Sequence, residues 1–232
     1  MRLDKYLSTF ADLTRSQAKR ALKNGEVECD GELIKDPSFK VTADHHISLV
    51  GMPLEPVGER YIMLHKPEES VCSHVDDGYM SIFSLMELPR PDKLHVAGRL
   101  DADTTGLVLI TSDGQWSHAL TSPRRHCSKR YRVWLADPIT DGAISQLEQG
   151  VELHGEDKPT QPAQVEQVSD TEILLTISEG KYHQVKRMLA AVGNKVAALH
   201  RESMGDIELD EDLEPGDWRY LTEDEIASVD KR

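Results

Sequence analysis

The stretch that decides the fold is HVAGRLDADTTGLVLIT, residues 95–111. Its second half, GLVLIT at 106–111, is an apolar run that predicts a buried strand. Asp101 and Asp103 stand two residues apart just before it, and Thr105 follows two residues later. A carboxylate held in a loop at the edge of a strand is a candidate nucleophile or base. The spacing fits two unrelated chemistries, so the rest of the chain has to decide between them.

The composition indicates a soluble globular protein. The chain has 232 residues, of which 38% are apolar and 29% charged, and this length suits a small domain joined to a medium one. The longest apolar runs are far shorter than the roughly 20 residues that span a bilayer, and the first residues show no signal sequence. We therefore expect a cytoplasmic protein with no membrane association. Its three cysteines, Cys29, Cys72 and Cys127, lack metal-ligand spacing, so we expect no structural zinc or disulfide scaffold.

The charge is distributed unevenly along the chain. The net charge of −14 argues at first against a nucleic-acid partner, but Lys and Arg outnumber Asp and Glu by six to two in residues 1–25. Residues 121–135 and 180–201 each carry five basic residues and no acidic ones, whereas residues 202–232 carry three against twelve. Binding of a polyanion depends on local patches rather than on the sum. These three clusters are therefore either RNA-binding surfaces or ordinary solvated faces.

The first fifty residues predict a small unit of two helices and a hairpin. Apolar positions in residues 2–10 fall on one helix face. Thr14 or Ser16 can cap a second helix over residues 16–23, which ends at Asn24-Gly25. Asp30-Gly31 lies between alternating residues and predicts a two-residue hairpin turn, and HISLV at 46–50 predicts a further strand. The proline and glycine residues of 51–59 are typical of a linker.

This pattern resembles the alpha-L RNA-binding domain, a module shared with a ribosomal small-subunit protein. The resemblance rests on RLDKYLS and SQAKRALKNGEVECDGE and covers about residues 1–50. It implies an RNA-binding domain over residues 1–58, including the linker. The second helix carries four cations on or near one side, which would hold RNA phosphates without doing chemistry: Arg15, Lys19, Arg20 and Lys23.

Residues 59–232 predict one mixed domain of strands and helices. The strand candidates are YIMLH, GLVLIT, RYRVWLA, AQVEQV, EILLTIS and KVAALH, and the helical candidates are residues 114–121, 140–149, 182–192 and 223–229. Thr222 and Glu225 have the spacing of a capping box for the last helix. Because the strands outnumber the helices and follow each other closely, we expect an α+β fold with a mixed, mainly antiparallel sheet flanked by helices.

One interpretation of the opening stretch is phosphoryl transfer. DADTT matches the Asp-x-Asp-x-Thr motif of haloacid-dehalogenase-type phosphotransferases, in which the first carboxylate attacks phosphorus and magnesium bridges the pair. That motif should end a buried parallel strand, and HVAGRL is a poor one. A five-residue match also arises often by chance.

The other interpretation draws on four stretches in order. GRLDADTTGLVLITSDG, YIMLHKPEESVCS, SPRRHCSKRYRVWL and SEGKYHQVKRMLAAVGNKVAALHR together resemble the RsuA-type family of pseudouridine synthases. With the N-terminal module, the resemblance covers nearly the whole chain, and SHALTSPRRH and HRESMG point to the members that act on 16S ribosomal RNA. It implies isomerisation of a uridine, at position 516, without cofactor or metal. The implied partner is 16S RNA or a partly assembled small subunit, and we expect a monomer.

The resemblance also implies roles for individual residues. Asp101 is the catalytic carboxylate, acting either as a nucleophile or as a base at the sugar, and Lys186 keeps it ionised. Tyr131 stacks on the uracil or hydrogen-bonds near the carboxylate, and Arg99 enters the RNA stack or holds phosphate beside an extruded nucleotide. Asp103 receives no chemistry and is expected to be a turn residue. The further RNA contacts expected are Lys129, Arg130, Lys181, His183, Gln184 and Arg187.

Three alternatives stay open at this point. Tyr131 could be an ordinary strand aromatic, and Lys186 a solvated helix cation. The whole chain could be an RNA-binding assembly factor that has lost its activity. Gly98 and Gly106 are expected to serve the geometry of the backbone.

Overall fold

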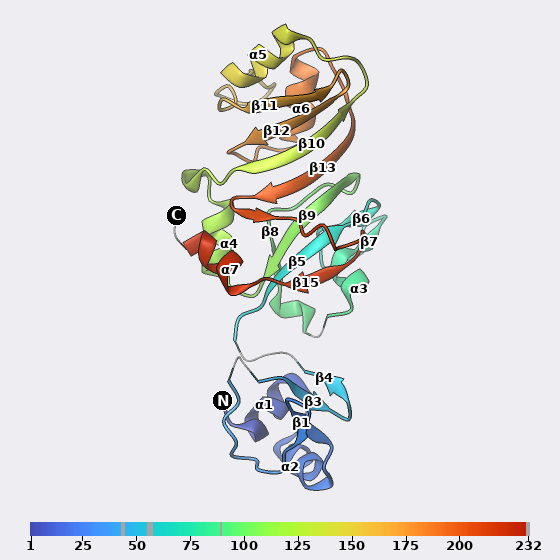
Figure 1. Cartoon of the computed structure of the whole chain (residues 1–232), viewed down its shortest axis with the longest axis vertical. Helices are drawn as coiled ribbons and strands as arrows, with labels where there is room; N and C mark the ends of the chain where they lie inside the picture. The colour runs from blue at the N-terminus through green and yellow to red at the C-terminus, as the bar shows by residue number, and fades with distance from the viewer. Residues whose placement is uncertain (43–44, 55–57, 89, 231–232) are drawn as a thin grey trace. The chain divides into compact units, whose positions relative to one another are not determined.

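The computed structural model describes residues 1–42, 45–54, 58–88 and 90–230. The chain divides into two compact units, each with its own contacts (Figure 1). The first comprises Met1–Arg60 with Leu88–Pro91, and the second comprises Tyr61–Glu87 with Asp92–Arg232. No helix among the described residues is long and apolar enough to cross a membrane.

The first unit begins with the two predicted helices, α1 (Leu3–Phe10) and α2 (Arg15–Asn24). Of the two possible caps for α2, Thr14 is the one used. The Gln17 amide donates to Thr14 Oγ1 at 3.2 Å, and the Thr14 amide donates to Gln17 Oε1 at 2.8 Å. Gly25 ends the helix at φ 73°, a conformation that glycine adopts without steric cost. The predicted boundaries of α2 are thus confirmed to within one residue.

A four-stranded sheet completes this unit, in the order β2-β1-β3-β4. Its strands are β1 (Val27–Cys29), β2 (Glu32–Leu33), β3 (Ile47–Leu49) and β4 (Met52–Pro53). The predicted hairpin is confirmed, with Asp30 and Gly31 both at positive φ. The prediction of a linker over 51–59 was wrong at its start, because β4 pairs with β3. Residues 55–57 of that stretch lie outside the described part of the chain.

The second unit is built on a nine-stranded sheet whose main path runs β11-β12-β10-β13-β9-β5-β15, with β8 beside β9 and β14 beside β13 (Figure 1). The β13–β9 pairing is parallel, and the other pairings in this sheet are antiparallel. The predicted mixed, mainly antiparallel sheet is therefore confirmed. The strands are β5 (Tyr61–Lys66), β8 (His95–Ala97), β9 (Thr104–Thr111), β10 (Lys129–Leu135), β11 (Gln164–Ser169), β12 (Glu172–Ile177), β13 (Val196–Met204), β14 (Ile207–Glu208) and β15 (Trp218–Tyr220).

Helices flank this sheet at two places. In Figure 1, α5 (Asp141–Gln149) and α6 (Gln184–Ala191) lie at the end formed by β11 and β12, and α4 (Gly114–Thr121) lies beside α7 (Glu223–Asp230). The four predicted helices are confirmed. So is the capping box of α7, since the Glu225 amide donates to Thr222 Oγ1 and the Thr222 amide donates to Glu225 Oε2. The remaining short elements are β6 (Ser70–Val71), β7 (Met80–Ser81), α3 (Ile82–Met86), η1 (Pro91–Lys93) and η2 (Pro123–Arg125).

Strand β9 is the centre of the second unit. Seven of its eight residues are buried, and Leu107 and Leu109 pack with Trp116 of α4 in one apolar core. Gly106 lies at φ 106° opposite Arg201 in the parallel β9–β13 pair, where a Cβ would come within 2.3 Å of the Arg201 carbonyl oxygen. A glycine is therefore required for the two strands to approach this closely. The preceding loop, residues 98–103, is therefore attached to a strand that is packed in the core.

Candidate active site

The loop before β9 opens into a cleft of about 700 Å³ within the second unit. Such a volume is within the range of pockets that enclose small organic groups. The side chains that line it come from this loop, from β10, from β13 and from the start of α6. They include Arg99, Asp101, Lys129, Tyr131, Lys181, Tyr182, His183, Gln184, Lys186 and Arg201.

Asp101 and Lys186, which are 85 residues apart in the chain, form an ion pair in this cleft. Lys186 Nζ lies 3.0 Å from Asp101 Oδ2 and 2.7 Å from Asp103 Oδ1. His183 Nε2 lies 3.4 Å from the other oxygen of Asp101. The Asp101 side chain is 38% exposed, so that a substrate can reach it. The predicted pair is therefore brought together, and Asp103, expected to be only a turn residue, also shares the lysine.

The contacts of Lys186 with the two aspartates change the pKa values of Lys186 and of Asp103. Burial alone would lower the pKa of Lys186, but its hydrogen bonds to Asp103 and Asp101 outweigh that effect and raise it. The hydrogen bond from Lys186 also lowers the pKa of Asp103. At neutral pH the ammonium is therefore fixed between two carboxylates. That is the position a magnesium ion would need in the phosphotransferase interpretation, so the structure argues against that chemistry.

Tyr131 lies on the wall of the cleft, and a buried arginine holds it there. Its ring is 8% exposed, and Arg201 Nη1 donates to the phenol oxygen at 3.4 Å. The same guanidinium donates to the Leu107 carbonyl at 2.9 Å and to the Gly98 carbonyl at 2.6 Å. Arg201, which is 1% exposed, thus connects β13, β9 and the start of the 98–103 loop. Arg201 was not predicted individually, because in the sequence it is only one member of a basic cluster.

A buried lysine also stabilises the backbone of the 98–103 loop. Lys66, at the end of β5, is fully buried, and burial lowers the pKa of its ammonium group. It donates to the carbonyls of Thr104 at 2.8 Å, Pro67 at 3.0 Å and Ala102 at 3.4 Å. A buried ammonium without such acceptors would be very unfavourable. Lys66 therefore fixes the backbone on either side of Asp103, a role that the Lys-Pro pair in the sequence did not disclose.

Most of the expected RNA-binding cations of this unit are engaged within the protein. Arg130 pairs with Glu202 at 3.0 Å, and Lys181 and Arg187 both pair with Glu156, at 2.9 Å and 3.1 Å. Lys129 donates to the carbonyls of Cys127 and Glu179, and Gln184, which is buried, donates to the Glu179 carboxylate. Within the described parts of the chain, exposed Arg99 has no hydrogen bond or ion pair. It alone of these predicted cations projects unpaired at the cleft.

The four cations of α2 in the first unit have a different environment. Arg15, Lys19, Arg20 and Lys23 are all exposed, and none forms a hydrogen bond or an ion pair with any residue that the structure describes. Arg15, Lys19 and Lys23 follow each other at four-residue intervals and so form one stripe on the helix. The helix therefore presents a positively charged surface to solvent.

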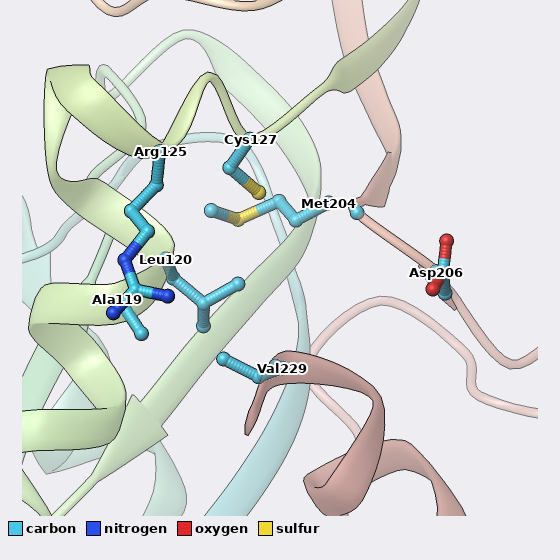
Figure 2. A pocket seen from close by; sticks show the side chains of 8 residues that line it. Ala119, Leu120, Arg125, Cys127, Met204, Asp206 and Val229 are labelled. Carbon is cyan, nitrogen blue, oxygen red and sulfur yellow. The ribbon is translucent and has the colours of Figure 1, made fainter. Parts of the chain in front are cut away.

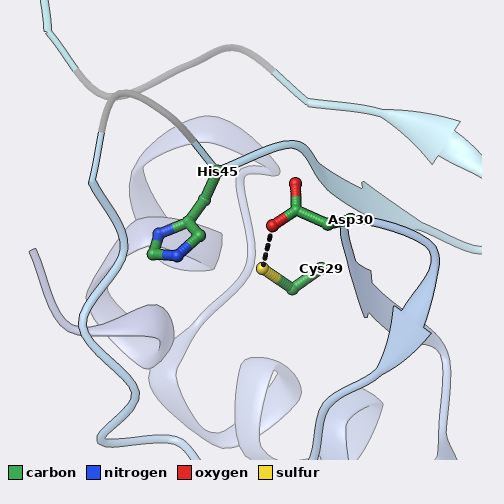
Figure 3. Close-up of side chains that lie close together, drawn as sticks. All are labelled: Cys29, Asp30 and His45. Carbon is green, nitrogen blue, oxygen red and sulfur yellow. Dashed lines mark hydrogen bonds between the residues drawn. The ribbon is translucent and has the colours of Figure 1, made fainter.

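Two further places could be taken for sites. Arg125, Cys127, Met204 and Val229 surround a hollow beside α4 (Figure 2), but its volume of about 10 Å³ admits no more than a water molecule. In the first unit, Cys29, Asp30 and His45 bring three potential metal ligands within 4.8 Å of one another (Figure 3). His45 Nδ1 already accepts from the Thr42 amide at 3.1 Å, and Cys29 donates to Asp30 at 3.5 Å. The cleft is therefore a stronger candidate for the functional site than either of these places.

Comparison with known proteins identifies the families of both parts of the chain. The sequence model of the family described as RNA pseudouridylate synthase matches residues 60–191, and that of the S4 domain matches residues 1–47. The chain belongs to the RNA pseudouridylate synthase family. A crystal structure of a pseudouridylate synthase superimposes on this synthase with a TM-score of 0.71 and 47% identity, over 99% of each chain.

Curated relatives match over the same extent. The chain is 55% identical to the ribosomal small subunit pseudouridine synthase A of Vibrio parahaemolyticus, over 99% of each chain. It is 50% identical to the protein of the same name from Escherichia coli K12, over 99% of this chain and all of that one. The synthase thus has the domain composition that the sequence resemblance implied, an RNA-binding module followed by a pseudouridine synthase domain.

Proposed function

We propose that this synthase converts one uridine of 16S ribosomal RNA, at position 516, to pseudouridine, with Asp101 as the catalytic carboxylate. The observation that carries the proposal is the Asp101–Lys186 ion pair, with its 3.0 Å contact, inside an open cleft. Relatives that are named for the small ribosomal subunit and are 50–55% identical over nearly the full length support an RNA of that subunit as the substrate. The RNA is taken either free or in a partly assembled subunit.

The reaction requires three changes at the uridine. The bond from N1 of the base to C1′ of the sugar breaks, the base turns, and a bond from C5 to C1′ forms. The hydrogen on C5 leaves as a proton, and N1 gains one, so the overall composition does not change. A carboxylate can assist as a covalent nucleophile or as a base at the sugar. No oxidant, reductant or cofactor enters this balance.

The neighbours of Asp101 favour this use of the carboxylate. Lys186 keeps a positive charge 3.0 Å from it, which offsets part of the repulsion between the carboxylate and a polyanion. A base has to leave its stack before its sugar can be reached, at a cost of roughly a few kcal/mol. Tyr131, on the cleft wall, would stack on the extruded uracil. Arg99, exposed and unpaired among the described residues, would fill the stack or bind the adjacent phosphate.

The first unit would supply affinity rather than chemistry. Its positive stripe on α2 is exposed, and contacts from such cations to phosphates position RNA without reading its sequence. The synthase would therefore use one unit to hold the RNA and the other to present a uridine to Asp101.

The decisive variant is Asp101→Asn. It keeps the shape of the side chain but removes the charge, so release of tritium from position 5 of uridine in the RNA should fall by at least about 10³-fold. RNA binding should change by less than about threefold. Asp157→Asn, which alters an exposed carboxylate outside the cleft, should release tritium at the native rate. Near-native release by Asp101→Asn would refute the assignment.

A second experiment separates the synthase from an inactive assembly factor. Pseudouridine maps of ribosomal RNA from cells with and without this gene should differ at one uridine of 16S RNA. A map that does not change would favour the assembly factor, and a change in another RNA would correct the substrate.

A further inference from the structure

We propose that Tyr182 is a stacking platform for the base next to the target uridine. This inference rests on the proposed function and adds a residue that positions the substrate. Tyr182 is 76% exposed, more than any other large hydrophobic side chain in the described part of the chain. It lies on the rim of the cleft that contains Asp101.

The ring of Tyr182 is held in one orientation by its neighbour. It stacks on the imidazole of His183, with ring centroids 3.8 Å apart and planes inclined by 21°. One face of the phenol is therefore covered, whereas its high exposure leaves the other face open to solvent. A single exposed aromatic residue needs no explanation. One that is stacked on one side and open on the other offers a preformed surface to a planar group.

The backbone around this pair is also fixed. Arg187 Nη1 donates to the Tyr182 carbonyl at 2.9 Å, and Arg187 Nη2 donates to the His154 carbonyl at 2.6 Å. The Lys181 amide donates to the buried Gln184 side chain at 2.9 Å. These hydrogen bonds reduce the ordering that RNA binding would otherwise require of this loop.

The Tyr182–His183 pair lies beside the carboxylate of Asp101. His183 lies at φ 46°, a left-handed conformation that is uncommon for residues other than glycine and often marks functional sites. This conformation leaves His183 Nε2 3.4 Å from Asp101 Oδ1. Tyr182 therefore stands one stacked ring away from a residue that contacts the catalytic carboxylate.

The position indicates which base it receives. Tyr131 is 8% exposed and forms part of the cleft wall, as suits the extruded uracil inside the cleft. Tyr182 is at the rim and faces solvent, so the base that stacks on it stays outside the cleft. A nucleobase adjacent to an extruded uridine has lost a stacking partner, and an aromatic side chain can replace that partner for any of the four bases.

Binding and fluorescence can test this without turnover. The full chain carrying Asp101→Asn is combined with Tyr182→Ala or Tyr182→Phe, and the probe is a fragment of 16S RNA around the mapped uridine. In separate RNAs, 2-aminopurine replaces each of the two nucleotides on either side of that uridine. Tyr182→Ala should raise Kd about 5- to 100-fold, whereas Tyr182→Phe should stay within about twofold because it keeps the ring. At one adjacent position, the parent protein should quench the fluorescence and the Tyr182→Ala protein should not.

Controls keep the outcome unambiguous. Tyr220→Ala removes another exposed tyrosine, which packs on Trp218 and does not line the cleft, and it should leave Kd and quenching unchanged. Quenching that persists in Tyr182→Ala, or an equal loss in Tyr182→Phe, overturns the stacking. Retained tritium release by Asp101→Asn would instead refute the proposed catalytic role, a result that this binding assay does not depend on.

Discussion

Helix α2 of the first unit and the active site of the second use their cations in opposite ways. On α2 of the first unit, Arg15, Lys19, Arg20 and Lys23 are exposed and unpaired among the described residues. In the second unit, Lys186 is bound between two carboxylates, and buried Lys66 and Arg201 each donate to backbone carbonyls of or beside the 98–103 loop. Both sets consist of lysine and arginine, so composition does not distinguish them.

The difference teaches what each set of charges can do. An exposed, unpaired cation can exchange salt ions for RNA phosphates, which gives affinity that depends on salt. A cation whose donors already bind internal acceptors is less able to bind a phosphate. It instead holds the groups it contacts in place and influences their ionisation. Substitutions of the α2 cations should therefore change binding, and substitutions of Lys186, Lys66 or Arg201 should change the rate or the fold.

After Asp101→Asn, the largest effect is expected at Lys186. Lys186→Met should lower the rate at which bound RNA is converted by about 10²- to 10³-fold, because it removes the fixed charge beside Asp101. Single-turnover measurements at saturating protein would show this. Lys186→Arg keeps the charge, although its planar group fits differently, and should lose no more than about tenfold. If Lys186→Met weakened binding and left the bound rate unchanged, the proposed division between the units would fail.

A smaller effect, on binding alone, is expected for the stripe on α2. Replacing Arg15, Lys19 and Lys23 together by Gln should weaken RNA binding about 10- to 100-fold near 0.1 M salt. It should also reduce the slope of log K against log salt by about 2, since each phosphate contact contributes about 0.7 to 0.9. Titrations at several salt concentrations measure both quantities, and the bound-state rate should not change.

The matched control for this stripe comes from the other unit. Lys93, Lys158 and Lys195 are also exposed, and the described structure gives their side chains no hydrogen-bond or ion-pair partner. Replacing these three by Gln alters the net charge by the same amount. Equal losses of affinity and of salt slope in the two triple variants would mean that overall charge, and not the α2 surface, determines RNA binding.

The sequence predicted local structure better than it predicted which charges are internal. Thr222 and Glu225 identified the start of α7, and Asp30-Gly31 identified a hairpin, because caps and turns depend on a few adjacent residues. Lys66 and Arg201 could not be recognised individually as supports of the active-site loop. Charged residues are mostly exposed, and their burial depends on carbonyls that only the folded sheet brings together.

The site was accessible to sequence reasoning only through the resemblance. Asp101 and Lys186 are 85 residues apart, and nothing in their spacing indicates contact. The parallel β9–β13 pairing was likewise not predicted, since pairing between distant strands is a tertiary property. The positive φ of His183 and the stack of Tyr182 on its ring were also not predicted, because His183 itself carries no glycine or turn signal.

The smallest effect is expected at Asp103, which tests whether sharing the lysine matters. Its contact with Lys186 is short, at 2.7 Å, but its side chain is 70% exposed, and an exposed ion pair contributes only about 0–1 kcal/mol. Asp103→Asn should therefore lower the rate at which bound RNA is converted by no more than about fivefold. A loss as large as that of Asp101→Asn would make Asp103 an equal partner in the chemistry.

The pH dependence of that small effect follows from the directions of the two pKa values. The pKa of Asp103 is lowered by Lys186, so its contribution is complete above the unfolded value near 3.8 and is lost as the pH falls through the folded value. The pKa of Lys186 is raised by its two carboxylates, so its contribution is complete below 10.5 and is lost as the pH rises through the folded value. Both groups are therefore charged from about pH 5 to pH 9. The ratio of the native rate to the Asp103→Asn rate should be constant across that range in single-turnover measurements. A ratio that changes there would mean that a group other than this pair controls the effect of Asp103.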